Sequence, residues 1–411
     1  MDALGLTRLE PAFLKEIEEN MLQQDEKKAN FYYCLSCSTC FSCCPYTNVH
    51  ENMNPRVFMR KIILGMKEDV LQDPFIWNCT ACGRCTMTCP QHIDLPSLIR
   101  TVRGNFGLTA PGFVQKVVDD HLRTGNQMEV SEDDYLETLS WMEEELQEAV
   151  GDEKAKIPID KKGAKYLYVI NPREVRYYPM DIQIAAKIFW AAGEDWTMSS
   201  KNWDGTNWAV FNGRDNEAAT IARRMLEEIR RLEIKNLLIT ECGHAIWAHI
   251  KGAPLWLGEK PYEVFSVLQL IEKYLEEDRI KVDPTRNSEP VTLHDPCNLI
   301  RKSGIPGITE TPRKILKKVV TDFREMWPNR EYNYCCGGGG GAVGMGSDYK
   351  REVRMKKGLI KAEQIRQTGA KIVVTPCHNC FDQLEDINKE FDLGIKVVQV
   401  SSLVNNALVL P

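Results

Sequence analysis

The spacing of apolar residues along this chain changes near residue 163. Before that point, apolar residues recur at intervals of three and four, which predicts amphipathic helices. Residues 1–30 are expected to contain a helix with one apolar face, packed on its own protein or docked to another subunit. That face comprises Leu14, Ile17 and Met21. Residues 111–160 are expected to form a helical connector, whose buried face comprises Leu136, Leu139, Met142 and Leu146.

After residue 163 the chain alternates between short apolar runs and longer amphipathic segments. The short runs are rich in β-branched residues, which favours strands. They are YLYVI (166–170), NLLIT (236–240), VTL (291–293), KIVVT (371–375) and IKVVQV (395–400). The segments with helical periodicity include residues 181–192, 216–232, 266–277 and 380–391. Strands that alternate with helices predict parallel sheets covered by helices.

The strand-rich region contains an internal repeat. Three short sequences recur in the same order: VINPRE (169–174) and LHDPCN (293–298), FNG (211–213) and CCG (335–337), LLITEC (237–242) and IVVTPC (372–377). The proline and the glycine of the first two pairs are 41 residues apart in both copies. The interval from this glycine to the cysteine of the third pair is longer in the second copy. An insertion after the glycines would explain the difference. We expect two homologous α/β halves, at 163–280 and 281–411, rather than two units that merely look alike.

Cysteine is frequent and regularly spaced in this chain. Thirteen of the fifteen cysteines fall into three sets. The first two sets each read C-x2-C-x2-C-x3-C followed by proline, which is the run that binds [4Fe-4S] clusters in bacterial ferredoxins. They comprise Cys34, Cys37, Cys40 and Cys44, and then Cys79, Cys82, Cys85 and Cys89. Zinc is disfavoured, because a zinc site needs only four ligands and has no use for this repeat.

The spacing within each run predicts crossed ligation of two cubane [4Fe-4S] clusters. Three thiolates at intervals of three can surround one cubane, while the fourth, next to a proline, reaches the other cubane. One cubane would be bound by Cys34, Cys37, Cys40 and Cys89, and the other by Cys79, Cys82, Cys85 and Cys44. Cys43 remains, and we interpret it as a small buried apolar residue. A helix-like segment joins the runs, so we expect a mostly helical ferredoxin domain over 1–110, followed by the connector at 111–162.

Composition and charge narrow the class of protein. The chain has 411 residues, enough for two or three domains, and its hydrophobic fraction of 43% is ordinary for a soluble protein. No apolar run approaches the length that spans a bilayer, and the N-terminal residues lack the pattern of an export signal. Cysteines in this setting indicate metal rather than disulfides. The formal charge of −6 argues against nucleic acid as a partner.

The third cysteine set lies in the second half of the repeat. It comprises Cys297, Cys335, Cys336, Cys377 and Cys380. Five thiolates are one more than a cubane takes, and two adjacent cysteines need an open geometry to share a metal site. The glycines that follow, Gly337 to Gly341, match neither a Walker loop nor a dinucleotide fingerprint. They would let backbone N–H groups approach sulfur closely, or would form a simple flexible turn.

The first half of the repeat has lost most of these ligand positions. The residues at the four lost positions are Arg173, Phe211, Asn212 and Ala245. Cys242, which corresponds to Cys377, survives. One thiolate cannot hold a cluster, so we expect the first half to be a scaffold or a wall of the active site.

The second half resembles the CCG domain of heterodisulfide reductase catalytic subunits, and the ferredoxin pair before it is the same fused arrangement. The resemblance covers almost the whole chain. The stretch Cys242-Gly243-His244-Ala245 is similar to one in the heterodisulfide-reductase-like subunits of the Dsr, Hmc and Tmc membrane complexes of sulfate-reducing bacteria. The resemblance implies a noncubane [4Fe-4S] cluster bound by the five cysteines of the third set. Gly337 and Gly338 would lie beside it.

The resemblance also implies a function, that of an oxidoreductase subunit which passes electrons through the two cubanes to or from a noncubane site that acts on a disulfide or trisulfide. In the methanogen enzyme both halves bind clusters, so the degenerate half here favours a different sulfur substrate, such as a disulfide or trisulfide of the sulfur-carrier protein DsrC. Such a chain would lie on the cytoplasmic side of a membrane, held by a haem b subunit with multihaem cytochrome c beyond it. The helix at 10–22 is our candidate for the docking element. His244, His294 and His378 are candidate proton donors by residue type, with a structural role as the alternative.

Two other functions fit the same residues. The chain could be a pure electron conduit between a membrane cytochrome and soluble carriers, with no substrate of its own. It could also be the iron–sulfur subunit of a flavoprotein dehydrogenase complex, since such subunits are similar in carrying CCG halves.

Overall fold

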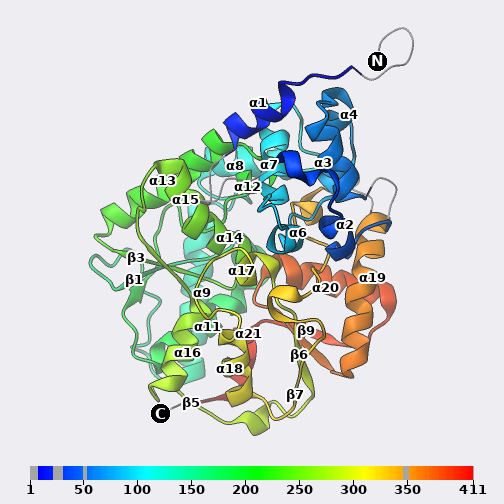
Figure 1. Ribbon diagram of the computed structural model, residues 1–411. Coiled ribbons are helices and arrows are strands. Elements are labelled where there is room, and N and C mark those ends of the chain that lie inside the picture. Colours follow the sequence, from blue (N-terminus) through cyan, green and yellow to red (C-terminus); the bar gives the residue numbers. More distant parts are fainter. Residues whose placement is uncertain (1–7, 22–30, 50–52, 346–350, 411) are drawn as a thin grey trace.

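The computed structural model describes residues 8–21, 31–49, 53–345 and 351–410. These residues form a helical module and two α/β halves, and Figure 1 shows the helical module lying across one end of both halves. The expected combination of a helical N-terminal part with two tandem α/β halves is confirmed.

The described residues of the helical module contain no strand. Its helices are α1 (Phe13–Asn20), α2 (Thr39–Cys43), α3 (Pro55–Ile63), α4 (Lys67–Leu71), α5 (Phe75–Asn78), α6 (Arg84–Thr88) and α7 (Leu95–Asn105), with a 3-10 turn at Phe31–Leu35. The two longest helices are capped by their sequence. Asn54 and Asp94 each accept hydrogen bonds from backbone N–H groups of the first turn, and a proline stands early in each helix.

Helix α1 packs its apolar face on its own chain. Phe13, Leu14 and Ile17 are buried, α1 contacts α3 and α7, and the rings of Phe13 and Phe106 lie 5.4 Å apart, edge to face. The predicted helix is therefore present. Its apolar face is covered by the chain itself, so the docking role of residues 10–22, of which residue 22 lies outside the described residues, stays a prediction that would have to use the exposed face.

The connector consists of α8 (Val114–Thr124) and α9 (Glu132–Val150). Ser131 caps α9, and α9 packs along α11 of the first half. Its buried face comprises Tyr135, Thr138, Leu139, Met142 and Leu146. Leu136, which we expected to be buried, is only partly so. The connector therefore belongs to the core of the first half rather than to a separate unit.

The two halves have the same sheet topology. In the first, β1 (Tyr166–Val169), β2 (Trp196–Thr197), β3 (Asn236–Ile239) and β4 (Glu263–Ser266) are all parallel, in the order β2-β1-β3-β4. In the second, β6 (Val291–Leu293), β7 (Phe323–Arg324), β8 (Ile372–Val374) and β9 (Lys396–Val398) are all parallel, in the order β7-β6-β8-β9. The chain orders match strand for strand, which supports the repeat.

Helices cover both sheets. The first half carries α10 (Pro172–Arg176), α11 (Pro179–Ala191), α12 (Ala209–Asn212), α13 (Asp215–Arg231), α14 (Gly243–Trp247), a π-helical turn (Ala248–Gly252), α15 (Ala253–Leu257) and α16 (Val267–Glu276). The second carries α17 (Cys297–Ile300), α18 (Thr311–Val319), α19 (Arg351–Thr368), α20 (His378–Phe391) and α21 (Val400–Ala407), with 3-10 turns at Pro284–Arg286, Arg330–Tyr332 and Ala342–Gly344. An antiparallel pair, β5 (Lys281–Val282) and β10 (Leu408–Val409), joins the C-terminal residues to the segment between the halves.

Contacts between the halves are reciprocal. Helix α11 packs against α21, and its counterpart α18 packs against α16. Helix α14, which follows β3, packs against α17, which follows β6. The carboxyl ends of the central strands of both sheets therefore face each other, and the loops that carry the third cysteine set meet the equivalent loops of the first half.

Candidate iron–sulfur centres

The two ferredoxin runs form matching loops. In each run a short helix, α2 or α6, carries the third cysteine and ends at the fourth, and the two helices pack side by side. Cys44 and Cys89 have nearly the same extended backbone conformation, with φ of −74° and −75°. The following proline disfavours a helical conformation at both positions, so each fourth cysteine points away from its own run.

The structure places each fourth cysteine among the cysteines of the other run. Cys89 interacts electrostatically with Cys34 and Cys40. Cys44 interacts with Cys79 and Cys82. One small apolar cavity is lined by Cys44, Cys79, Cys82 and Cys85 together. This arrangement supports crossed ligation.

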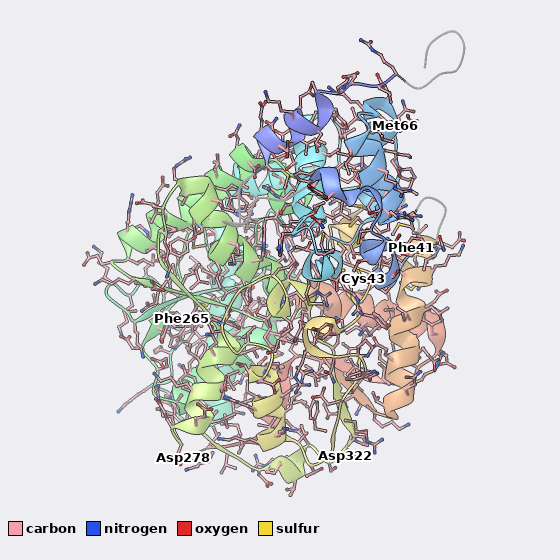
Figure 2. The ribbon with its side chains drawn as sticks, in the orientation of Figure 1. Phe41, Cys43, Met66, Phe265, Asp278 and Asp322 are labelled. Carbon is pink, nitrogen blue, oxygen red and sulfur yellow. The ribbon has the colours of Figure 1, made fainter. Side chains whose placement is uncertain are left out.

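Burial makes two of these thiols, those of Cys44 and Cys40, hard to ionise without metal. It raises the pKa of Cys44 to about 12 and that of Cys40 to about 11. A metal that binds here must displace these protons, and an electropositive metal core would supply the compensating charge. Cys43 differs from our expectation of a buried apolar residue. It lies on α2 (Figure 2), is only half-buried, and accepts a 3.2 Å hydrogen bond from the Thr88 hydroxyl.

All five cysteines of the third set are buried and close together. The thiol of Cys336 donates a 3.5 Å hydrogen bond to the sulfur of Cys380, and the N–H of Gly337 donates to the sulfur of Cys335 at 3.4 Å. Cys297 interacts with Cys335, and Cys377 interacts with Cys380. The five sulfurs thus form a continuous group.

Secondary structure explains why these five sulfurs meet. Cys297 begins α17, four residues beyond the end of β6, and Cys377 immediately precedes α20, three residues beyond the end of the neighbouring strand β8. Cys380 lies in the first turn of α20, one helical turn beyond Cys377. The loop before α19 brings Cys335 and Cys336 to the same edge of the sheet, and Gly337, at φ +96°, turns the chain sharply after them.

The glycine run also brings the third set against the second ferredoxin run. A side chain at Gly339 would meet the carbonyl oxygen of Thr80 at 2.6 Å, and one at Gly340 would meet that of Cys79 at 2.5 Å. We expected these glycines to let N–H groups approach sulfur. Gly337 does so, whereas Gly339 and Gly340 serve close packing between the two modules.

Three cations lie beside the cysteine sites: the partly buried Arg301 and the buried Lys357 contact the second ferredoxin run, and the buried Lys361 interacts with the third set. Arg301 donates to the carbonyl of Cys82 at 2.8 Å and interacts with Cys297 and Cys335. Lys357 donates to the carbonyl of Asn78, and burial lowers its pKa to about 8. Lys361 is also buried, with its pKa lowered to about 8 by burial. Such buried positive charges fit a resident anionic group, and thiolate-bound iron–sulfur clusters are anionic.

The first half forms a wall beside the third set. Arg173, at the position equivalent to Cys297, forms an ion pair with Asp382 and a 3.1 Å hydrogen bond to Asn379. The N–H of Gly243 points at the sulfur of Cys377, whose pKa is lowered to about 6, mainly by a hydrogen bond from Cys380. The degenerate half therefore supports the intact one through backbone and charged contacts.

Cys242 belongs to a buried polar group in this wall. Its sulfur lies 3.3 Å from Nδ1 of His244 and 3.8 Å from the Asn171 amide nitrogen. Burial lowers the pKa of His244 to about 3, so its ring is neutral at ordinary pH. The amide nitrogen of Gln399 lies 2.9 Å from Nε2 of His378. Burial opposes protonation of His378, but Glu174 and Asp181 raise its pKa well above the usual value.

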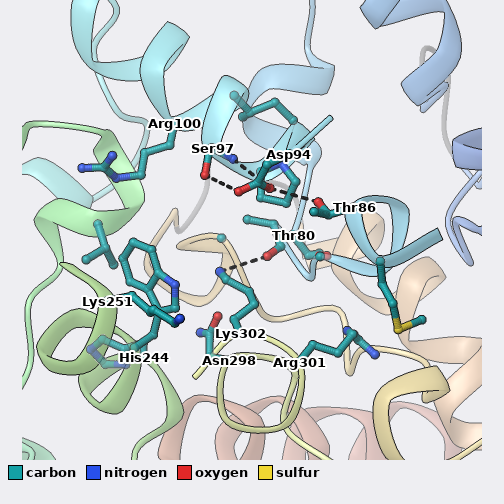
Figure 3. Close-up of a pocket in the computed structure, with 18 of the residues that line it drawn as sticks. Thr80, Thr86, Asp94, Ser97, Arg100, His244, Lys251, Asn298, Arg301 and Lys302 are labelled. Carbon is teal, nitrogen blue, oxygen red and sulfur yellow. Dashed lines mark hydrogen bonds between the residues drawn. The ribbon is translucent and has the colours of Figure 1, made fainter. Parts of the chain in front are cut away.

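A cavity of about 890 Å³ lies where the helical module meets both halves. Figure 3 shows His244, Lys251 and Asn298 of the halves facing Asp94, Ser97 and Arg100 of the helical module. Nε2 of His244 has no hydrogen-bond partner among the described residues. Because Asn298 directly follows Cys297, the cavity reaches the immediate neighbourhood of the third set.

Two family models match the chain. The 4Fe-4S dicluster domain covers residues 33–94, and CCG, a cysteine-rich domain, covers residues 291–385. The Hdr-like menaquinol oxidoreductase iron-sulfur subunit 2 of Archaeoglobus fulgidus is 25% identical over 396 residues, which cover 84% of this chain and 70% of the relative. A chain of the dihydromethanophenazine:CoB–CoM heterodisulfide reductase of Methanosarcina barkeri is 24% identical over 404 residues, which cover 91% of this chain and 93% of the relative.

The chain thus contains a CCG domain and a 4Fe-4S dicluster domain, and it is similar to heterodisulfide-reductase-like iron–sulfur subunits. A further relative, the EtfAB:quinone oxidoreductase of Syntrophomonas wolfei, is 22% identical over 91% of this chain and 58% of its own length. The two matched domains contain both ferredoxin runs and all five cysteines of the third set.

Several residues around the sites of this CCG protein were not predicted from its sequence. They are Tyr46, Arg301, Lys357 and Lys361. Arg301 stands four residues after Cys297, and Tyr46 stands two residues after Cys44, so proximity to a ligand was the available signal. The two lysines carried no such signal, because lysine in a helix normally indicates an exposed face.

Proposed function

We propose that this chain is the iron–sulfur electron-transfer subunit of a membrane-associated respiratory complex, and that its third cysteine set acts on a disulfide or trisulfide. The observation that carries the proposal is the direct contact between the ferredoxin runs and the CCG loop. The Tyr46 hydroxyl donates a 2.8 Å hydrogen bond to the carbonyl of Cys335, and Gly340 packs on Cys79. Two ferredoxin-type sites in series, joined to a third site of different composition, suit delivery of electrons to a terminal site.

The ligand sets are part of the proposal. One cubane is bound by Cys34, Cys37, Cys40 and Cys89, and the other by Cys44, Cys79, Cys82 and Cys85. A noncubane [4Fe-4S] centre is bound by Cys297, Cys335, Cys336, Cys377 and Cys380. Gly337 contributes its N–H to the sulfur of Cys335, and Gly338 contributes its N–H to Cys336. Bound clusters would supply the one-electron steps that reduction of a sulfur–sulfur bond requires.

Residues around the cavity would bind the substrate and move protons. The cavity beside Asn298 admits the substrate, and Lys251 and Lys302 give it a positive wall that suits an anionic sulfur compound. His244 faces this cavity with an unpartnered Nε2 and contacts Cys242 with Nδ1. Its neutral ring can therefore donate a proton on one side and accept one on the other. We propose His244 as the group that moves protons between the cavity and the buried wall.

Relatives whose names refer to menaquinol and quinone oxidoreductases support partners in a membrane-associated complex. We propose a haem b membrane subunit, with multihaem cytochrome c beyond it, and a peripheral position on the cytoplasmic side. In the described residues no helix is both long and apolar enough to cross a bilayer. DsrC, in sulfate reduction, is the proposed sulfur-carrying substrate.

One relative favours a second candidate function. The name of this relative, EtfAB:quinone oxidoreductase, refers to electron transfer between EtfAB and quinone, which supports a flavoprotein partner. In this alternative the chain conducts electrons from a flavoprotein to quinone, and the third set binds no substrate.

Addition of a sulfur substrate to the oxidised protein separates the two functions. We expect an anionic disulfide or a trisulfide-bearing carrier protein to change the paramagnetic signal of the CCG centre, while the signals of the two cubanes stay the same. Lys251→Ala should weaken this response, and Lys260→Ala, an exposed lysine outside the cavity, is the matched control. If no disulfide or trisulfide alters the CCG signal, the conduit function is favoured and the substrate proposal is wrong.

A further inference from the structure

His294 is a buried histidine without a partner for either ring nitrogen. It directly follows strand β6 and is 1% exposed. Among the described residues neither Nδ1 nor Nε2 has a hydrogen-bond partner. A ring nitrogen of His294 and the sulfurs of Cys336 and Cys380 all lie within 4.8 Å of one another. The histidine therefore faces the third cysteine set.

An unpartnered imidazole is costly to bury, at about 1–3 kcal/mol for each polar atom without a hydrogen bond. His249, another buried histidine, in the first half, shows the usual solution. Its Nδ1 lies 2.6 Å from the Tyr262 hydroxyl and its Nε2 lies 2.9 Å from the Gly205 carbonyl. The contrast indicates that the natural partner of His294 is a group at the cysteine site.

Lys361 approaches the same site from helix α19. It is 1% exposed, and its ammonium interacts with Cys335, Cys336 and Cys380. The side-chain hydrogen bond of its ammonium among the described residues goes to the thioether of Met326, at 3.8 Å. A thioether is a weak acceptor, so this contact does not balance a buried charge.

The nearest carboxylate is already engaged. Asp295 accepts two 2.8 Å hydrogen bonds from Arg313 and a further one from the N–H of Arg330. Its charge is therefore matched by Arg313, and Lys361 needs another anion. The thiolate-bound centre that would occupy the third set is such an anion, and it lies on the side of Lys361 that faces Cys336.

We propose that His294 and Lys361 form a nitrogen wall of the CCG centre, in which each donates an N–H hydrogen bond to sulfur of that centre. The inference rests on the proposed function, because it requires a centre bound by the five cysteines. His294 and Lys361 are positioning residues, since they act through the sulfur atoms. Hydrogen bonds and positive charge near cluster sulfur stabilise the reduced state, so the wall raises the reduction potential of the CCG centre.

The test is a potentiometric titration of the reconstituted full chain, followed by the paramagnetic signals of each centre. His294→Phe and Lys361→Met remove the donors while keeping similar volume. We expect each to lower the one-electron reduction equilibrium constant of the CCG centre about tenfold, which corresponds to about 59 mV. His294→Gln and Lys361→Arg keep an N–H donor, so they should shift the reduction potential of the CCG centre less.

Two controls separate this effect from general damage. His249→Phe removes a buried histidine away from the cysteines, and Lys356→Met removes an exposed lysine from the same helix. Neither should move the CCG potential, and no variant should move the potential of the cubane bound in part by Cys34. Unchanged potentials in both His294→Phe and Lys361→Met would overturn the proposal.

If the His294 variants lose iron, their potentials cannot be compared. A spectroscopic measurement on the unmutated chain then tests the proposal. Protein labelled with ¹⁵N-histidine should show a weak nitrogen coupling to the CCG signal, and the coupling should be absent in His294→Gln with its iron retained. Absence of any histidine coupling in the unmutated chain would overturn the role of His294. A chain that holds only about eight irons would instead contradict the proposed function, because the third centre itself would be missing.

Discussion

The hydroxyl of Tyr46 donates a 2.8 Å hydrogen bond to the carbonyl oxygen of Cys335, across 289 positions of the sequence. Tyr46 is buried two residues after Cys44, and burial raises its pKa well above the usual value, so the phenol stays protonated as a donor. This one bond joins the first ferredoxin run to the CCG loop. It therefore holds Cys44 and Cys335, which are proposed ligands of two different centres, close to each other.

Tyr46→Phe should therefore weaken the junction. Loss of the donor leaves a buried carbonyl without its partner, which we expect to lower the free energy of unfolding by about 1–3 kcal/mol. Iron content should be unchanged, because tyrosine is not a ligand. Denaturant unfolding of the reconstituted protein measures the effect, with Tyr332→Phe, an exposed tyrosine, as the control. Equal stability of the two variants would contradict the importance of this bond.

Cys335→Ser should remove the CCG centre and leave both cubanes. Cys335 lies between Cys297 and Cys336, so its loss interrupts the group of five sulfurs. Iron content should fall by about four atoms per chain, and the ferredoxin-type signals should persist. Cys43→Ser, a substitution in a cysteine outside all three sets, should leave iron unchanged. Loss of every centre from Cys335→Ser would show that the sites do not assemble independently.

Gly340→Ala tests the close approach of the CCG loop to the second ferredoxin run. Gly340 has φ +66°, and a methyl group there would lie 2.5 Å from the carbonyl oxygen of Cys79. Gly394 has nearly the same φ, +61°, but open space around it. Both alanine variants carry the backbone penalty of a left-handed residue, about 1–2 kcal/mol.

Gly340→Ala should cost about a further 1–3 kcal/mol in stability, because the chain must move to admit the methyl group. It should also disturb the paramagnetic signal of the cubane that Cys79 is proposed to bind. Thermal unfolding and low-temperature spectra of the two variants measure both effects. Indistinguishable behaviour of Gly340→Ala and Gly394→Ala would contradict the packing role.

Cys242→Ala and Cys377→Ala compare equivalent positions of the two halves. Each cysteine lies three residues beyond the end of a central strand, β3 or β8. Cys377→Ala should lose the CCG centre, whereas Cys242→Ala should retain all iron, because its half lacks the other four thiolates. Loss of a whole centre from Cys242→Ala would show that the first half also binds metal.

Of the eight strands that the described residues form in the two parallel sheets, the sequence predicted five and missed β2, β4 and β7. β1, β3, β6, β8 and β9 lie within the five expected runs. β2 and β7 have two residues each, which is too short for a detectable alternation, and their pairing depends on neighbours far along the chain. The helix α1 was predicted, but its apolar face alone could not show that the chain itself covers that face, and the docking role of residues 10–22 stays a prediction.

The candidate site could be predicted only as far as its cysteines. Their spacing identified the two ferredoxin runs. It also suggested that Cys44 and Cys89 each bind the cubane of the other run, and the arrangement of the two loops supports this. The charged surroundings could not be predicted in this way. Lys357 and Lys361 look like exposed helical lysines in the sequence, and only the packing of α19 against the cysteine loops makes them buried. Gly339 and Gly340 owe their role to a contact with another module.

Iron analysis of the anaerobically reconstituted full chain tests the central claim most directly. The account predicts about twelve irons per chain, from two cubanes and one further four-iron centre. Cys297→Ala should reduce this to about eight, while Cys43→Ala should leave it at about twelve. A fully reconstituted chain that holds about eight irons, with no further loss in Cys297→Ala, would contradict the existence of the CCG centre.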